Sequence, residues 1–249
     1  MDLPPGLHIL ACMVFAPELK LLGVPESRVT LLEQGLHRYP DDLRAEVAAA
    51  LARIESDPAV ETVVLLYGYC GGGLEGLRAG RVRLVAPLMH DCVPLLLGRP
   101  PAPEAAGAPG SFYLSAGWIE HGKTPLTEYE ITAAQYDEET ALWVGREMLK
   151  SYRDVAVIVQ EPLIGEAHRA YARRMAALFD LGFRETPGDL GWLRRVIAGQ
   201  GGEGVLTAPP GRALRLADYP GQDSLAGRES PAGQTTPADR PAGAEGRPQ

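Results

Sequence analysis

Short apolar runs alternate with amphipathic stretches over the first 217 residues, and this alternation constrains the fold more than any other feature. Val63–Tyr67 is almost entirely aliphatic, as expected of a strand buried on both faces of a parallel sheet. Asp41 stands where a helix N-cap belongs, and apolar residues then recur at helical spacing. Strands separated by helices predict βαβ units, so we expect an α/β protein with a mostly parallel, Rossmann-like sheet flanked by helices.

The apolar runs predict about six strands. These are expected at 7–15, 63–67, 82–86, 111–114, 155–159 and 204–207, with helices at 41–54, around 95–97, and at 138–152, 166–179 and 190–197. Two arrangements fit this order: one doubly wound sheet, or two stacked α/β lobes divided near residue 130. The segment 100–109 is interpreted as a loop.

The last part of the chain, residues 218–249, has a different composition. It is rich in Gly and Pro, and its large apolar side chains are Tyr219 and Leu225. Such a segment buries too little surface to offset the entropy lost on ordering. We therefore expect an α/β domain over 1–217 and a disordered tail over 218–249.

Composition limits the function classes. The chain of 249 residues is 45% hydrophobic and carries a formal net charge of −8, which disfavours nucleic acid and anionic membranes as partners. No apolar stretch approaches the roughly 18 residues of a membrane span, and the N-terminus lacks the pattern of a secretory signal. Three cysteines, an odd number, argue against a disulfide framework. We expect a soluble, cytoplasmic protein.

All three cysteines lie at or just beyond the carboxyl end of an expected strand. Cys12 lies in the first apolar run, Cys70 follows VVLLYGY, and Cys92 follows VRLVAPLMHD. The carboxyl ends of parallel strands meet at one edge of a sheet, where open α/β folds bind ligands. We therefore expect the three sulfur atoms to cluster, together with His90 and Asp91, which directly precede Cys92.

Thiolate and imidazole ligands suit Zn²⁺ or iron, and suit Mg²⁺ or Ca²⁺ poorly. Three thiolates with an open fourth position are typical of a catalytic site, and they could equally hold a 4Fe–4S cluster. Under this hypothesis Cys12, Cys70 and Cys92 are metal ligands, while His90 is a fourth ligand or a general acid/base and Asp91 supports it. The competing interpretation is that each cysteine is a small buried apolar residue, since the sequence contains no C-x-x-C pair.

The stretch 68–73 allows two other chemistries. Residues 68–72 (GYCGG) match G-x-S-x-G with cysteine as the nucleophile, at the strand end where a nucleophile elbow belongs. Gly71, Gly72 and Gly73 could instead bind a cofactor phosphate through their backbone N–H groups. The stretch has neither the spacing of G-x-G-x-x-G nor the lysine of a P-loop.

Polar residues at two other places are further candidates. Glu120 ends an apolar segment at the start of a polar loop, and we assign it a catalytic role as an acid. His37 lies in a polar stretch before an expected helix. Tyr113 and Trp118 could line a pocket, but we interpret both as core residues.

Several motifs resemble domain-of-unknown-function family 1638. They are ACMVFAPEL (11–19), LHRYPDDLR (36–44), LLYGYCGGGLEGL (65–77), APLMHDCVPLLLG (86–98) and SFYLSAGWIE (111–120). The family pattern implied by this resemblance contains Cys12, His37, Cys70, His90, Asp91 and Cys92. The resemblance also implies an association with corrinoid-dependent methyl transfer. The chain departs from the pattern at Gly71 and Gly72, where more polar residues are usual, and in its tail.

Three functional hypotheses follow. The first is a metal-binding enzyme with Zn or Fe in the three-cysteine site. Its partner would be a small-molecule substrate or a corrinoid-system protein, and one reaction it could catalyse is methyl transfer to a thiol. The second is a hydrolase or acyl transferase with Cys70 as nucleophile. The third is a non-catalytic accessory protein or metallochaperone.

Overall fold

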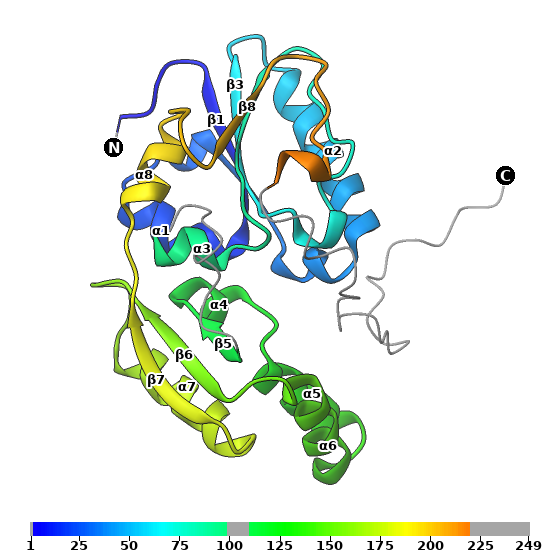
Figure 1. Cartoon of the computed structure of the whole chain (residues 1–249), viewed down its shortest axis with the longest axis vertical. Helices are drawn as coiled ribbons and strands as arrows, with labels where there is room; N and C mark the ends of the chain where they lie inside the picture. Colours follow the sequence, from blue (N-terminus) through cyan, green and yellow to red (C-terminus); the bar gives the residue numbers. More distant parts are fainter. Residues whose placement is uncertain (1, 99–109, 220–249) are drawn as a thin grey trace, which may run out of the picture.

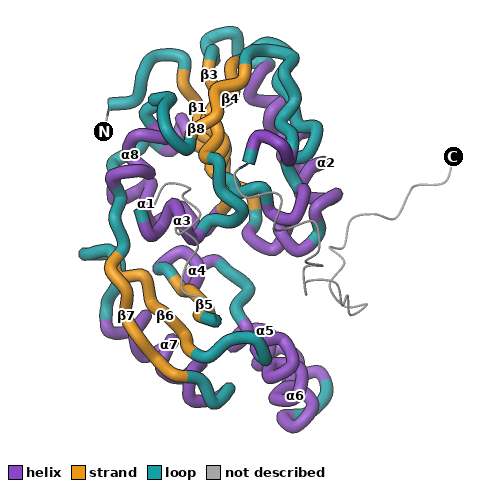
Figure 2. The backbone as a smooth tube through the Cα atoms, in the orientation of Figure 1, coloured by secondary structure: helices purple, strands orange, loops and turns teal. Residues whose placement is uncertain are grey.

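The computed structural model describes residues 2–98 and 110–219, which form two α/β lobes stacked along the long axis of the molecule (Figure 1). The first lobe has a five-stranded sheet of order β2-β1-β3-β4-β8, and the second has a three-stranded sheet of order β5-β6-β7. The tube in Figure 2 shows the two sheets as separate orange layers with helices around them. The expected α/β class with mostly parallel strands is confirmed, and the described residues form eight strands in two sheets.

The first sheet is covered on both faces. Its strands are β1 (Leu7–Cys12), β2 (Val29–Leu32), β3 (Thr62–Leu66), β4 (Arg83–Pro87) and β8 (Val205–Ala208), of which only β8 is antiparallel to its neighbour. Helix α2 (Pro40–Glu55) packs on one face, and α1 (Ala16–Leu21), α3 (Val93–Leu97) and α8 (Gly191–Ile197) pack on the other. Along β3, Val63 and Leu65 face α2 whereas Val64 and Leu66 face the other core, because successive side chains of a strand alternate.

The second lobe is built around a smaller parallel sheet. Its strands are β5 (Ser111–Leu114), β6 (Asp154–Val159) and β7 (Gly182–Pro187), and its helices are α4 (Ala116–His121), α5 (Pro125–Gln135), α6 (Glu138–Leu149) and α7 (Glu166–Leu178). Val155 and Val157 pack against Ala172 and Met175 of α7 in one buried cluster. No helix in the described part of the chain has the length and apolar character needed to cross a membrane.

The chain passes between the lobes twice. It leaves the first lobe after α3 and returns between β7 and α8, so α8 and β8 complete the first sheet. Residue 130 lies inside α5, and the lobe division therefore differs from the one expected near 130. The loop expected at 100–109 lies outside the described residues, which resume at Gly110.

The two lobes are in close contact. Gly117 of α4 packs on the backbone of the 3₁₀ helix η1 (Met13–Phe15), where a Cβ atom at Gly117 would lie 1.8 Å from the carbonyl oxygen of Val14. Only glycine permits this approach. At a second contact, Arg38 of the 3₁₀ helix η3 (Gln34–Arg38) forms an ion pair of 2.9 Å with Glu128 of α5.

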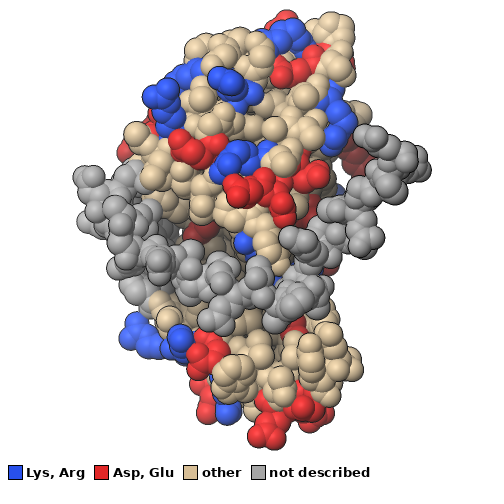
Figure 3. All heavy atoms as spheres, turned by 90° about the vertical axis from the view of Figure 1, so that its right-hand side faces the viewer, with Lys and Arg blue, Asp and Glu red and all other residues tan. Residues whose placement is uncertain are grey.

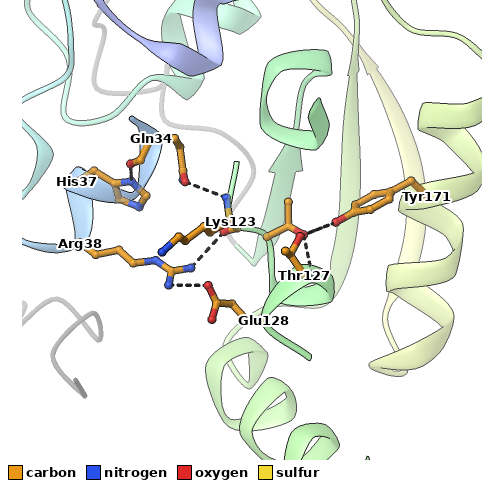
Figure 4. Close-up of polar contacts among 8 residues, drawn as sticks. Gln34, His37, Arg38, Lys123, Thr127, Glu128 and Tyr171 are labelled. Carbon is orange, nitrogen blue, oxygen red and sulfur yellow. Dashed lines mark hydrogen bonds and ion pairs between the residues drawn. The ribbon is translucent and has the colours of Figure 1, made fainter. Parts of the chain in front are cut away.

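Figure 4 shows how η3 holds the second lobe. The side-chain oxygen of Gln34 accepts a hydrogen bond of 2.9 Å from the amide of Lys123, and Arg38 donates to the Lys123 carbonyl at 3.1 Å. Thr127 and Tyr171, joined through their hydroxyls at 3.2 Å, tie the same segment to α7. These contacts fix the segment between α4 and α5 relative to the first sheet.

Two local predictions are wrong. Helix α2 begins at Pro40 with Tyr39 as N-cap, so Asp41 lies in the first turn, where its negative charge still favours the helix dipole. The folded part also extends past residue 217. Tyr219 is 2% exposed and packs against Tyr69 with ring centroids 4.9 Å apart. The rest of the expected tail, 220–249, lies outside the described residues.

Tyr219 gives a test of where the folded part ends. We expect a chain ending after Ala217 to be less stable by about 2–4 kcal/mol than a chain ending after Tyr219, because the shorter chain loses a buried aromatic side chain. It also loses the ion pair of 2.6 Å between Asp218 and Arg212. Urea denaturation of the two truncated proteins measures the difference, and equal midpoints would contradict the packing described.

Candidate functional site

The three cysteines follow three neighbouring strands of the first sheet. Cys12 is the last residue of β1, while Cys70 and Cys92 lie in the loops that follow β3 and β4. These strands are adjacent and parallel, so their carboxyl ends share one edge of the sheet. All three cysteines are free and partly exposed. The structure therefore places the three cysteines at one edge of the sheet, as the sequence predicts.

The loops after β3 and β4 pair with each other beyond the strands. The amide of Tyr69 donates to the carbonyl of Met89 at 2.8 Å, and the amide of Cys70 donates to the carbonyl of His90 at 2.9 Å. Gly68 makes this possible, because a Cβ atom there would lie 2.5 Å from the Cα atom of Asp91. The backbone thus fixes Cys70 beside the Asp91–Cys92 segment.

Backbone conformation and packing explain why glycines follow Cys70. Cys70 itself has a φ of 47°, and Gly71 and Gly72 follow with φ values of 64° and 103°. A left-handed backbone is unusual for a non-glycine residue, and such conformations concentrate at functional sites. At Gly73 the reason is packing, because a Cβ atom would lie 2.5 Å from the side chain of Leu43. Cofactor binding by these glycines stays a prediction.

The three thiols influence one another electrostatically. Burial raises the pKa of Cys12 to about 11. Burial is also the largest cause of the raised pKa values of Cys70 and Cys92, and the charges of Asp91 and Cys12 add to both shifts. The thiols are therefore protonated at neutral pH unless a cation compensates the charge.

Each sulfur atom nevertheless receives an N–H hydrogen bond, which lowers its pKa. The donors are the amides of Met13 and Val14 for Cys12, the amide of Gly68 for Cys70, and the indole of Trp118, at 3.3 Å, for Cys92. N–H donors favour the charged thiolate over the neutral thiol. The surroundings of the thiols are thus apolar enough to keep them neutral, but are arranged with donors suited to thiolates.

Asp91 and His37 lie near each other, and the charge of each shifts the pKa of the other. One carboxylate oxygen of Asp91 accepts from the amide of Val93 at 2.8 Å; the residue is exposed at the surface, and desolvation by the neighbouring protein is the largest cause of its raised pKa. The Nδ1 of His37 lies 2.6 Å from the carbonyl oxygen of Gln34. A carbonyl can only accept, so Nδ1 carries the proton; burial lowers the His37 pKa, which leaves the neutral ring with a lone pair on Nε2.

The remaining predicted site residues are less closely tied to the thiols. His90 is partly exposed; its carbonyl holds Cys70, and its charge lowers the pKa of Asp91. Glu120 lies in the second lobe, where it contacts His168 at 3.0 Å and His121 at 3.8 Å. Glu120 therefore joins α4 to α7, and its catalytic role stays a prediction.

A single bound metal ion was one of the arrangements expected for the cysteines. Within residues 2–98 and 110–219, no three His, Cys, Asp or Glu side chains form a group that could hold one metal ion. The thiols are near enough to shift one another's pKa values. The described residues thus contain no preformed site for a single metal ion.

Comparison with known families agrees with the motifs. A family model described as a protein of unknown function (DUF1638) matches residues 31–197. The chain belongs to the DUF1638 family. The matched segment of this DUF1638 protein includes Cys70 and Cys92, whereas Cys12 lies before it. No curated protein and no solved structure matches the chain.

Sequence reasoning missed two residues of this DUF1638 protein. Trp118 is not merely a core residue, because its indole contacts Cys92, and edge-on contact with His37 at 5.7 Å places it beside the site. Glu18, in α1, is 0% exposed, and neither carboxyl oxygen has a hydrogen-bond partner among the described residues. The sequence around Glu18 (APEL) reads as an ordinary helix start and carries no signal of this burial.

Glu18 should make stability depend on pH. Burial raises its pKa from 4.5 to about 8 in the folded protein, and the charge of Glu120 adds to the shift. Between these two values the unfolded chain has lost a proton that the folded chain keeps, so the free energy of unfolding falls as pH rises. The slope contributed by this one group is at most about 1.4 kcal/mol per pH unit.

We expect Glu18→Gln to flatten the decline in stability between pH 5 and pH 8, by a total of at least about 1 kcal/mol. Denaturant unfolding at several pH values measures this. Glu26→Gln, at an exposed position, is the matched control and should keep the wild-type slope. An unchanged slope in Glu18→Gln would show that the carboxyl group is not buried as described.

Proposed function

We propose that this DUF1638 protein binds a 4Fe–4S cluster through Cys12, Cys70 and Cys92. The observation that carries this proposal is the convergence of three free cysteines on the carboxyl edge of three adjacent parallel strands. An N–H donor at each sulfur supports it, because such hydrogen bonds stabilise metal-bound thiolates and tune the potential of clusters.

For the three thiols we favour a cluster over a single zinc ion. Three thiolates on one zinc lie within roughly 4 Å of each other, and the described residues contain no such ready-made group. The ligands of a cluster lie farther apart, at about 6–7 Å, because each thiolate binds a different iron. A cluster therefore does not need the close group of ligands that a single zinc ion requires.

Three cysteines leave one iron without a protein ligand. That corner would act as a Lewis acid toward a small-molecule substrate. His37 would accept a proton through Nε2, and Asp91 is the carboxylate whose charge acts on His37. His90 is the further acid/base candidate. The proposal is therefore an enzyme that uses a site-differentiated cluster.

The wider associations of this protein stay predictions. Corrinoid-linked methyl transfer to a thiol, which the family resemblance implies, needs a partner protein and a substrate that the site alone does not specify. The face in Figure 3 shows acidic and basic side chains interspersed on the upper lobe, without a broad basic field. This pattern supports a small molecule or a protein as partner ahead of nucleic acid.

A second candidate function has one observation in its favour. The left-handed backbone of Cys70, in the glycine-rich loop after β3, is the kind of strained turn that exposes a nucleophile. Its thiol, however, has a raised pKa, and the charges that act on it are those of Asp91 and Cys12 rather than a histidine. A hydrolase or acyl transferase is therefore second to the cluster protein.

The test is anaerobic reconstitution of the full chain with iron and sulfide. We expect about four iron and four sulfide per chain, with the broad visible absorption of a cluster. Cys12→Ala, Cys70→Ala and Cys92→Ala should each lose most of it. His8→Asn is the control, since His8 is bonded to Thr30 at 2.9 Å near the opposite end of β1, and it should load like the wild type.

The other outcomes decide between the alternatives. If the wild type instead binds one zinc ion per chain and the same three variants lose it, the three-thiol site is correct but the bound group is zinc and not a cluster. A chain that takes up neither metal and has one rapidly alkylated cysteine, Cys70, would favour the nucleophile.

A further inference from the structure

Helix α4 of the second lobe contacts the surroundings of two of the three cysteines. Trp118 donates its indole N–H to the sulfur of Cys92 at 3.3 Å. One residue earlier, Gly117 lies directly on the carbonyl of Val14, and the Val14 amide is a donor to the sulfur of Cys12. A single short helix thus supports thiols that belong to the other lobe.

The indole of Trp118 is held from several sides. Its own amide donates at 3.3 Å to the side chain of Ser115, the N-cap of α4, which fixes the start of the helix. The rings of His37 and Phe112 meet it edge-on, with centroids 5.7 Å and 6.2 Å away. His37 comes from η3, the same element that binds the second lobe through Gln34 and Arg38. Docking of the lobes and orientation of the indole therefore depend on one set of contacts.

We propose that Trp118 is a positioning residue for Cys92, through which docking of the second lobe and occupancy of the thiol site are coupled. This inference rests on the proposed function. A neutral thiol accepts a hydrogen bond weakly, whereas a metal-bound thiolate accepts a stronger, charge-assisted one. Loading the site therefore strengthens the bond to Trp118, and by linkage an undocked α4 weakens the loaded site to the same extent.

The principal test is Trp118→Phe in the full chain, reconstituted anaerobically with iron and sulfide. Phenylalanine keeps the aromatic packing but removes the N–H donor. We expect the cluster to have a more negative reduction potential, because the hydrogen bond withdraws charge from the sulfur and favours the reduced form. We also expect iron to be lost to a chelator about fivefold faster or more.

Trp143→Phe is the matched control. Trp143 lies on α6 and is 65% exposed, so the same chemical change there should alter neither the potential nor the rate of iron loss. A Trp118→Phe protein that behaves like Trp143→Phe, while the wild type holds its cluster, overturns this inference alone. A wild-type chain that binds no metal overturns the proposed function.

A measurement on the wild type covers the case in which Trp118→Phe does not fold. Hydrogen exchange of the backbone amides of 116–121 should be slower in the loaded protein than in the metal-free protein, because loading stabilises the docked α4. Equal exchange in the two forms would contradict the coupling.

Discussion

The pairing of the loops after β3 and β4 is the constraint on which the site depends. Hydrogen bonds from Tyr69 and Cys70 to the carbonyls of Met89 and His90 join the two loops beyond the last residues of the strands. They require that Gly68 lie against the backbone of Asp91, with no room for a side chain. The same contact brings Cys70 beside Cys92, and β1, next to β3, adds Cys12. A larger residue at position 68 would separate the loops and, with them, two of the three thiols.

The second lobe completes this arrangement. Gly117 lets α4 reach the backbone of η1, and Trp118 then reaches Cys92. The thiols themselves are placed by the first lobe, but their surroundings are shared between lobes. Burial keeps the thiols neutral, and the N–H groups around them favour charge. A positively charged metal group would offset the cost of burying the thiolates, and this is the physical basis of the metal site that we propose.

Much of this could be predicted from the sequence, for physical reasons. The aliphatic run at 63–67 predicted β3, since such a run is typical of a strand buried on both faces, and parallel pairing then placed the cysteines at one edge. Strands β2 and β7 were missed. Val29–Leu32 is short and half-buried, and Gly182–Pro187 has the polar sequence GFRETP, because its side chains are mostly in contact with solvent. The contact between Trp118 and Cys92 joins residues distant in sequence, and no local pattern encodes it.

The most direct test of the shared thiol site is alkylation followed by mass spectrometry on anaerobically reconstituted protein. All three cysteines are partly exposed, so each can report on its own protection. We predict that Cys12, Cys70 and Cys92 are protected together in the loaded protein and become reactive together as a chelator removes the iron. Retention of the iron while any one of the three is fully alkylated would contradict a site made of three thiolates.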